Sequence, residues 1–456
     1  MRKLSEQEIE RVVSLLKEGN TYRRSDQGNF GQTIIDHPTW LLSLMTSPTP
    51  LIPRSRMAIA MRKGIPDRVP VMCQLSIGHY LLNTEVTPAR LWFSSEGFVE
   101  ALVTLQRRYR FDGILINLPG HPEDWRREME RIEERPDAEV VWWKDGTFTV
   151  CPRDDFAVTY RRHPRTGEFT PDNRVRLDIE EVDLGRLLYE TPHTSGGLKY
   201  PYFHYDIGRG ERDSNRPEDW FPEYEWRTLE LVREMTDGTV SVHGELFSPF
   251  TQLMELLGYE NALVALLTHP EKCRDILGRY VEGCVWYGRE LARRGADAVL
   301  MSSAFAGGGF ISRAMYETFV LPFEKAVWDG IRSEFPDIPC YTHTCGAIGD
   351  RLDLMEATGL DGIDTLDPPP LGTVELDRAK EQLGTQVFIK GNIDSVNTLL
   401  LGSYEAARED IIRRIQWGMP GGAYILSTAC SVAPRVNPDR LEMMAGLCEV
   451  YGRYDR

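Results

Sequence analysis

The sequence predicts an α/β fold: a (β/α)8 TIM barrel with an N-terminal helical extension and a β-hairpin-containing insertion between the second and third strands. From Val69 to the C-terminal helix, short apolar segments bounded by Gly or Pro alternate with amphipathic segments of helical periodicity. This alternation indicates a parallel sheet, and eight such units are typical of a closed barrel. The chain has 456 residues, of which 41% are hydrophobic, so it is long enough to bury a large core.

The elements follow one another in a regular order. Residues 1–60 are expected to form helical segments broken by the Pro-rich run SPTPLIPRS, and residues 61–456 to form the barrel. The eight predicted strands are 69–75, 112–118, 239–246, 297–303, 339–345, 361–367, 386–392 and 423–429. The predicted helices that separate most of them are 94–110, 259–294, 312–334, 347–358, 375–383 and 403–418.

The interval 119–238, between the second and third strands, is too long for one helix. The pair Asp145-Gly146 lies between β-forming residues and predicts a hairpin, and a second hairpin is expected around residues 164–167. We interpret the interval as a β-hairpin cap with loops over the barrel mouth. The alternative is an insertion at the edge of the barrel with no role at the site.

Bulk properties exclude several classes of partner. The formal net charge of −16 argues against nucleic-acid binding, which needs a basic surface. No apolar run reaches the roughly 20 residues that span a membrane, and the amphipathic start is not typical of a signal peptide. Eight cysteines without regular spacing favour a reducing cytoplasm over a disulfide framework. A homodimer is compatible with these properties.

Three soft metal ligands are the most informative feature. His343 and Cys345 lie two residues apart in a predicted strand, so their side chains point to the same side. Cys430 follows a later strand. One imidazole and two thiolates suit Zn²⁺ and leave a coordination position open for a substrate. The alternative, a buried structural cysteine, is expected for the other six: Cys73, Cys151, Cys273, Cys284, Cys340 and Cys448.

Other polar residues crowd the carboxyl ends of the predicted strands, where barrel enzymes build their active sites. Glu245 and His243 are candidate general acids or bases, although a histidine hydrogen-bonded inside a barrel is more often structural. Asp394 is a third catalytic candidate, and a cap on the next helix is its alternative role. The candidate substrate-binding residues are Gln74, His79, Tyr80, Asn117 and Ser302.

Several stretches carry a family resemblance. GIPDRVPV (64–71), GADAVLMSS (295–303), ISRAMYETFVLPF (311–323) and FIKGNID (388–394) resemble the uroporphyrinogen decarboxylase-like superfamily. Within it, His343, Cys345 and Cys430 resemble the ligands of the zinc-dependent, corrinoid-linked methyltransferase branch. A similar arrangement in cobalamin-independent methionine synthases implies an acidic fourth ligand, for which Asp367 stands in about the right place and Asp364 is near. Capping of the following turn, 368–370, is the alternative role of Asp367.

The resemblance implies a zinc-dependent methyltransferase. It would move a methyl group between a small methylated substrate, with methoxylated aromatics as one candidate class, and a corrinoid. The sequence has no D-x-H-x-x-G motif, so the corrinoid is expected on a separate corrinoid-binding protein. The loop MCQLSIGHYLL lacks the arginines of true uroporphyrinogen decarboxylases, and the second strand ends in INLPG without their Asp. A decarboxylase of that type and a non-catalytic accessory barrel remain the alternatives.

Overall fold

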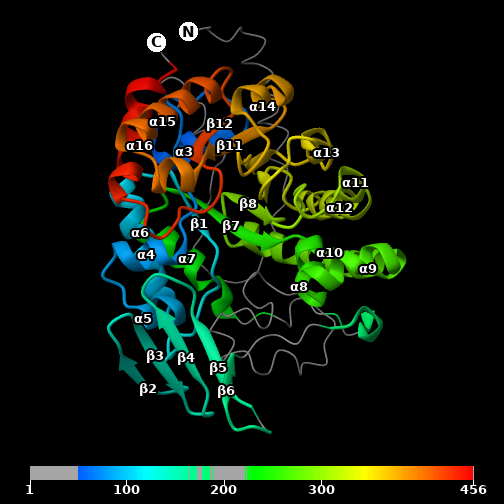
Figure 1. Cartoon of the computed structure of the whole chain (residues 1–456). Helices are drawn as coiled ribbons and strands as arrows, with labels where there is room; N and C mark the ends of the chain where they lie inside the picture. The colour runs from blue at the N-terminus through cyan, green and yellow to red at the C-terminus, as the bar shows by residue number, and fades with distance from the viewer. Residues whose placement is uncertain are drawn as a thin grey trace, which may run out of the picture. The chain divides into compact units, whose positions relative to one another are not determined.

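Seven parallel strands form the central sheet of the protein, in the order β1-β7-β8-β9-β10-β11-β12 (Figure 1). The computed structural model describes residues 50–163, 165–171, 177–184, 187, 221 and 223–454. The strands are β1 (Gly113–Ile116), β7 (Ser241–Phe247), β8 (Ala298–Ser302), β9 (Cys340–Thr344), β10 (Gly362–Thr365), β11 (Phe388–Ile393) and β12 (Tyr424–Thr428). Each corresponds to a predicted strand.

The first predicted strand, residues 69–75, joins the two edges of this sheet. Val71 and Leu75 form isolated parallel bridges with Leu426 and Val432, on and just after β12. On the other side, the Asp112 amide, directly before β1, donates to the Val71 carbonyl at 2.7 Å. The segment therefore takes the eighth position and closes the ring, and the (β/α)8 barrel is confirmed.

Helices surround the strands and begin mostly at Ser, Asn or Pro, as capping rules predict. They are α3 (Pro53–Met61), α4 (Ile77–Asn83), α5 (Pro88–Phe93), α6 (Ser95–Tyr109), α7 (Arg227–Met235), α8 (Pro249–Leu257), α9 (Tyr259–Thr268), α10 (Pro270–Arg293), α11 (Arg313–Phe319), α12 (Leu321–Arg332), α13 (Leu352–Ala357), α14 (Leu376–Leu383), α15 (Tyr404–Gly418) and α16 (Pro438–Tyr451). None of the helices in the described part of the chain combines the length and apolar character needed to cross a membrane.

Two predicted helices are each divided in two. The predicted helix 259–294 is interrupted at His269, before Pro270, and the predicted helix 312–334 is interrupted at Val320, before Pro322. Proline cannot donate the backbone hydrogen bond that continues a helix, so it starts a new one.

An apolar layer fills the barrel near the amino-terminal ends of the strands. Leu115, Leu300, Tyr341, Phe388 and Ile425, each from a different strand, are buried in one cluster with Met72 and with Met57, Ala60 and Met61 of α3. Helix α3 therefore closes the amino-terminal end of the strands. It is the described part of the predicted helical extension, because residues 1–49 lie outside the described residues.

The insertion forms a five-stranded antiparallel sheet, larger than the two predicted hairpins. Its strands are β2 (Met129–Glu134), β3 (Ala138–Trp143), β4 (Phe148–Pro152), β5 (Val158–Arg162) and β6 (Phe169–Pro171). The hairpin turn at Asp145-Gly146 is confirmed, since Gly146 has a φ of +83° and Asp145 accepts a hydrogen bond from the Thr147 amide.

This second sheet packs beside α5, which follows the first barrel segment (Figure 1). Glu139 of β3 accepts a hydrogen bond from the Ala89 amide, and Asp154 pairs with Arg435, in the loop after β12. Helix α7, at the end of the interval 119–238, packs on α6 and β7 as a barrel helix. A role for the sheet as a cap over the mouth stays a prediction, because most of residues 185–222 lie outside the described part.

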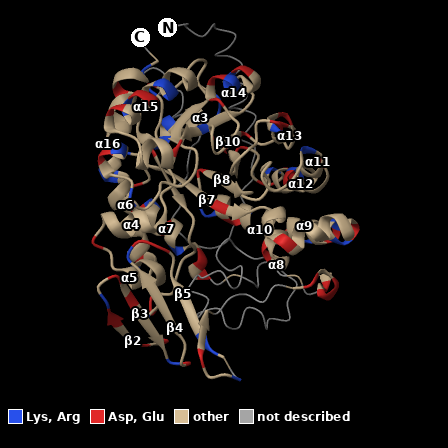
Figure 2. Ribbon diagram, in the orientation of Figure 1, with Lys and Arg blue, Asp and Glu red and all other residues tan. Residues whose placement is uncertain are grey.

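Acidic and basic side chains are interspersed on helices α13 to α16 (Figure 2). Many of them form short-range ion pairs, such as Arg313 with Asp353 between α11 and α13.

Candidate metal centre and barrel mouth

A polar layer lies next to the apolar layer of the barrel, nearer the carboxyl ends of the strands. In a strand, residues two apart point to the same side. Stepping two residues from Met72, Leu115, Leu300, Tyr341 and Phe388 of the apolar cluster therefore brings a second set of side chains inward, nearer the carboxyl ends. That set is Gln74, Asn117, Ser302, His343 and Lys390.

His343, Cys345 and Cys430 come together in this layer. The His343 Nε2 atom lies 3.4 Å from the Cys345 Sγ atom, which lies 3.9 Å from the Cys430 Sγ atom. The three ligand atoms all lie within 4.8 Å of one another. His343 is on β9, Cys345 directly follows this strand, and Cys430 is in the loop after β12. The closure of the barrel, rather than a local motif, therefore brings Cys430 to the pair.

The second nitrogen of His343 is held by a carboxylate. His343 Nδ1 lies 3.3 Å from Asp364 Oδ2 on the neighbouring strand β10. Lys390 of β11 donates to both Asp364 oxygens at 3.0 Å. Burial alone would raise the pKa of Asp364, but Lys390 and His343 outweigh it and lower that pKa. Such a carboxylate fixes the orientation of an imidazole and makes it a better ligand.

Lys390 was missed by the sequence interpretation. Its signal is a lysine inside an otherwise apolar strand, since lysine is almost never fully buried unless it is paired. The predicted strands 361–367 and 386–392 are neighbours in a barrel, which places Lys390 next to Asp364.

The electrostatics of the trio favour one ionised thiol. The hydrogen bond between the two thiols lowers the pKa of Cys430 to about 4 and raises that of Cys345. Burial lowers the pKa of His343, but its contacts with Asp364 and Cys430 outweigh burial and raise it to about 10. The two thiols therefore share one proton beside a charged imidazole. A metal ion that bound the three residues would displace the shared proton and the proton on His343 Nε2.

Asp367 lies beside the trio without joining the group of mutually close ligand atoms. Its Oδ2 atom accepts a hydrogen bond of 2.6 Å from the Gly346 amide, next to Cys345. Burial raises the pKa of Asp367 to about 6. The carboxylate thus caps the turn after the H-x-C pair rather than the turn at 368–370, and a role as fourth ligand stays a prediction.

Glu245, Ser302, Asn117 and Gln74 lie at the carboxyl ends of their strands, and their catalytic or substrate-binding roles stay predictions. Burial raises the pKa of Glu245 to about 7, against the opposing effects of His343 and a hydrogen bond with Ser302. Gln74 Oε1 and Asn117 Oδ1 are buried oxygen atoms without a hydrogen-bond partner in the described structure. Buried polar atoms are usually satisfied, and the role of these two residues in substrate binding stays a prediction.

Two of the three catalytic candidates are fully engaged. His243 is buried one layer below Glu245, with Nδ1 at 2.7 Å from the Tyr341 hydroxyl and Nε2 at 3.0 Å from the Ser241 hydroxyl. Burial lowers the pKa of His243 to about 3, so it is neutral. Asp394 accepts hydrogen bonds at 2.8 Å from the Val396 and Asn397 amides and caps η7 (Ser395–Leu400). Both residues take the structural roles that were their alternatives.

His79 and Tyr80 lie away from the mouth, which corrects their assignment to substrate binding. Ser76 caps α4, and the helix turns both side chains toward α6. There the His79 Nε2 atom lies 2.8 Å from the Tyr109 hydroxyl, and the ring of Tyr80 packs edge-on against Phe98. The physical reason is that the first βα connection becomes helical directly after Ser76, rather than forming an open loop.

The fold and this set of ligands define a barrel protein with a candidate soft-metal centre at the carboxyl ends of its strands. The family model described as "Uroporphyrinogen decarboxylase (URO-D)" matches residues 212–451. The chain therefore belongs to the uroporphyrinogen decarboxylase family, as its resemblance implied.

Individual relatives include both decarboxylases and methyltransferases. "Uroporphyrinogen decarboxylase 2, chloroplastic" of Oryza sativa subsp. japonica is 26% identical over 44% of this chain and 50% of its own length. "Methylated-thiol–coenzyme M methyltransferase" of Methanosarcina mazei is 24% identical over 48% of this chain and 56% of its own length. The chain thus spans about half the length of these curated relatives.

Among solved structures, a methyltransferase from Methanosarcina mazei has the same fold. The TM-score is 0.61, with 14% identity, over 88% of this chain and 99% of that one. At this identity the likeness concerns the fold alone.

Proposed function

We propose that this protein is a zinc-dependent methyltransferase that moves a methyl group between a small methylated substrate and the corrinoid of a separate protein. The observation that carries the proposal is the convergence of His343, Cys345 and Cys430 at the barrel mouth. The similarity to a methylated-thiol–coenzyme M methyltransferase supports it.

The three residues fit a zinc ion. With Zn–S near 2.3 Å and Zn–N near 2.0 Å, tetrahedral coordination separates two sulfurs by about 3.8 Å and a nitrogen from a sulfur by about 3.5 Å. The corresponding distances here are 3.9 and 3.4 Å. When bound, zinc would supply Lewis acidity toward a sulfur or oxygen of the substrate.

The chain's own residues prepare this centre. Asp364 orients the His343 ring so that its Nε2 atom faces the thiols, and Lys390 holds Asp364 ionised. Glu245 on β7 and Ser302 on β8 lie on adjacent strands and would position the substrate. The pKa of Glu245, about 7, is suited to proton transfer near neutral pH.

Elemental analysis tests the metal. About one zinc per chain is expected in the wild type, and its loss in Cys430→Ala. The matched control is Cys448→Ala, which removes a buried thiol on α16 outside the trio. Circular dichroism of each variant checks folding. Zinc retained by Cys430→Ala, or absent from protein purified without chelators, would contradict the metal site and favour an accessory barrel.

A spectroscopic assay tests the reaction. Cob(I)alamin is mixed with the protein and candidate methyl donors, or methylcobalamin with thiol acceptors, and the cobalamin absorbance is followed. Methylation or demethylation in the wild type, lost in Cys430→Ala, is the expected result. No transfer with any methoxylated, methylthio or methylamino donor, or with any thiol, would contradict the methyltransferase assignment.

Decarboxylation of a porphyrinogen is the second candidate, and the family match favours it. A substrate with several carboxylates needs several cations. In the polar layer of the described barrel, Lys390 is a cation already bound to Asp364, and Glu245 supplies a further carboxyl group rather than a cation. Incubation with uroporphyrinogen, followed by chromatography of the oxidised products, should therefore show no loss of carboxylates.

A further inference from the structure

Two of the eight cysteines face each other at the barrel mouth. The Cys345 Sγ and Cys430 Sγ atoms lie 3.9 Å apart, although 85 residues separate them in the chain. Both side chains are partly exposed, whereas the other six cysteines are buried. A small oxidant in solution therefore reaches this pair more readily than any other thiol of the protein.

The two sulfurs are close enough to be joined. A disulfide has an S–S distance of about 2.05 Å, so the sulfurs must approach each other by about 2 Å. Both residues lie beyond the ends of their strands, because β9 ends at Thr344 and β12 at Thr428. Rotation about the two Cα–Cβ bonds supplies this approach without breaking the hydrogen bonds between strands.

Backbone contacts next to each cysteine keep the pair together. The Asp367 carboxylate accepts a hydrogen bond of 2.6 Å from the Gly346 amide, directly after the first cysteine. The Ala429 amide, directly before the second, donates to the Ile393 carbonyl at 2.7 Å. Both loops are thereby attached to neighbouring strands of the barrel, and the two sulfurs are held near each other.

We infer that Cys345 and Cys430 form a reversible disulfide when the protein meets a peroxide, and that this bond and the metal compete for the same two sulfurs. The first part rests on the geometry of the thiols, and the second rests on the proposed zinc site. A disulfide leaves His343 as the remaining ligand of the trio, which is too few to hold zinc. The metal centre is therefore a redox switch.

The reaction balances with hydrogen peroxide as the oxidant. One sulfur attacks a peroxide oxygen, the O–O bond breaks, and a sulfenic acid and one molecule of water are formed. The second sulfur attacks the first, the S–S bond forms, and the hydroxyl leaves as a second molecule of water. The two thiols lose two electrons in total, which reduce the peroxide. A dithiol such as dithiothreitol restores both thiols by exchange.

Thiol counting on the reduced, zinc-free full chain tests the bond. Hydrogen peroxide, added in equal amount to the protein, should remove two of the eight thiols measured after denaturation, and dithiothreitol should restore them. Mass spectrometry of a tryptic digest should show peptide 333–351 linked to peptide 415–435. Fragment ions assign the bond to Cys345, because Cys340 lies in the same peptide. Loss of fewer than two thiols, a bond between other cysteines, or sulfinic acid without a bond would overturn the inference.

Matched variants locate the reaction. Cys345→Ser and Cys430→Ser should each abolish the linked peptides, and either variant suffices if the other does not fold. The control Cys448→Ser removes a buried thiol of α16 and should lose two thiols as the wild type does. A loss of two thiols that persists in Cys345→Ser or Cys430→Ser would overturn the pairing.

Zinc-loaded protein separates this inference from the proposed function. Peroxide should release zinc to a chromogenic chelator in step with the loss of the two thiols, and bound zinc should slow that loss. Zinc retained while the disulfide forms would overturn the competition. Disulfide formation in a chain that binds no zinc would remove the proposed function and leave the thiol pairing. Zinc binding without any peroxide-driven bond would overturn the inference and leave the proposed function.

Discussion

The two ends of the barrel differ in how their charged side chains are paired. At the amino-terminal end, Asp112, Asp297 and Asp361 each immediately precede a strand. Each carboxylate accepts a hydrogen bond from a backbone amide near the start of the neighbouring strand: Val71, Val242 and Cys340, respectively. Each carboxylate also forms an ion pair with an arginine.

At the carboxyl-terminal end, ionisable groups converge on one another instead. Glu245 has a raised pKa, two thiols share a proton, and Asn117 keeps a buried oxygen without a partner in the described structure. The comparison teaches that the charged groups of the amino-terminal end pair with one another and stabilise the ring, whereas the carboxyl-terminal end holds ionisable groups with shifted pKa values around the candidate metal centre.

The largest expected effect is at the amino-terminal end. Asp112→Asn removes a buried carboxylate that holds Arg56 at 2.6 Å, Arg68 at 2.9 Å and the Val71 amide. Removal of one partner from a buried ion pair costs about 3–5 kcal/mol. Urea unfolding followed by circular dichroism should show a loss of that size, and a change below about 1 kcal/mol would contradict the structural role of this network.

Glu245 should show the opposite behaviour, because its burial opposes folding once it is ionised. Its pKa is raised from 4.5 to about 7, so the native state binds the proton more tightly and stability falls as the pH rises between these values. The difference between wild type and Glu245→Gln, in protein freed of metal, should change by about 3 kcal/mol from pH 4 to pH 8. A difference that is flat with pH would mean that Glu245 is not buried as described.

The two ends of strand β10 give a direct contrast. Asp364→Asn weakens the support of His343 and should reduce zinc affinity about 10- to 100-fold, measured by competition with a chelating dye. Asp361→Asn, three residues earlier, removes the pairing with Arg332 and the Cys340 amide. It should lower unfolding stability and leave zinc affinity unchanged. Equal loss of zinc affinity in the two variants would contradict the claim that Asp364 supports the metal centre and Asp361 supports only the fold.

The smallest effect is expected on the outer helices. Asp353 pairs with Arg313 at 2.6 Å, but their side chains are 54% and 42% exposed. Exposed pairs contribute roughly 0–1 kcal/mol. Asp353→Asn should therefore change the free energy of unfolding by less than about 1 kcal/mol and leave zinc affinity unaltered. It serves as a surface control of the same substitution type for Asp112→Asn and Asp364→Asn.

Much of the fold could be predicted because each barrel strand is an apolar run bounded by Gly, Pro or Asp. Alternation along the strand placed His343 and Cys345 on the same side, and the carboxyl ends of the predicted strands pointed to Glu245 and Ser302. The contact between Cys345 and Cys430 needed the closure of the ring, which the number of strands implied. Lys390 could have been found by the same alternation from Phe388.

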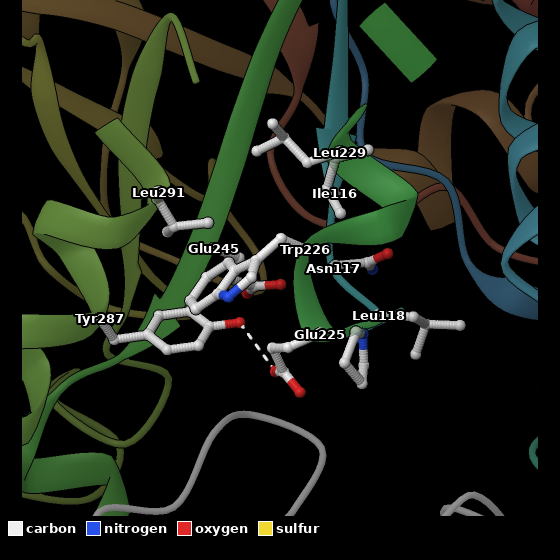
Figure 3. Close-up of a pocket in the computed structure, with 10 residues that line it drawn as sticks. Ile116, Asn117, Leu118, Glu225, Trp226, Leu229, Glu245, Tyr287 and Leu291 are labelled. Atoms are coloured by element: carbon white, nitrogen blue, oxygen red, sulfur yellow. Dashed lines mark hydrogen bonds between the residues drawn. The ribbon is translucent and has the colours of Figure 1, made fainter. Parts of the chain in front are cut away.

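Other features could not be read from local patterns. His79 and Tyr80 were assigned to the mouth because they follow the first strand, but the cap at Ser76 starts a helix that rotates them outward. Glu225 and Trp226 lie in η6 (Glu223–Trp226), directly before α7, and line a pocket together with Asn117, which is more than a hundred residues earlier in the chain (Figure 3). Residues this far apart show no spacing signal that would reveal such a pocket.

The measurement that tests the account most directly is zinc K-edge X-ray absorption on the wild-type protein. The account predicts two sulfur ligands at about 2.3 Å with nitrogen or oxygen ligands at about 2.0–2.1 Å. It also predicts loss of one sulfur, or of the metal itself, in Cys430→Ala. A shell of nitrogen and oxygen alone, or a spectrum that Cys430→Ala leaves unchanged, would contradict the metal centre at the barrel mouth.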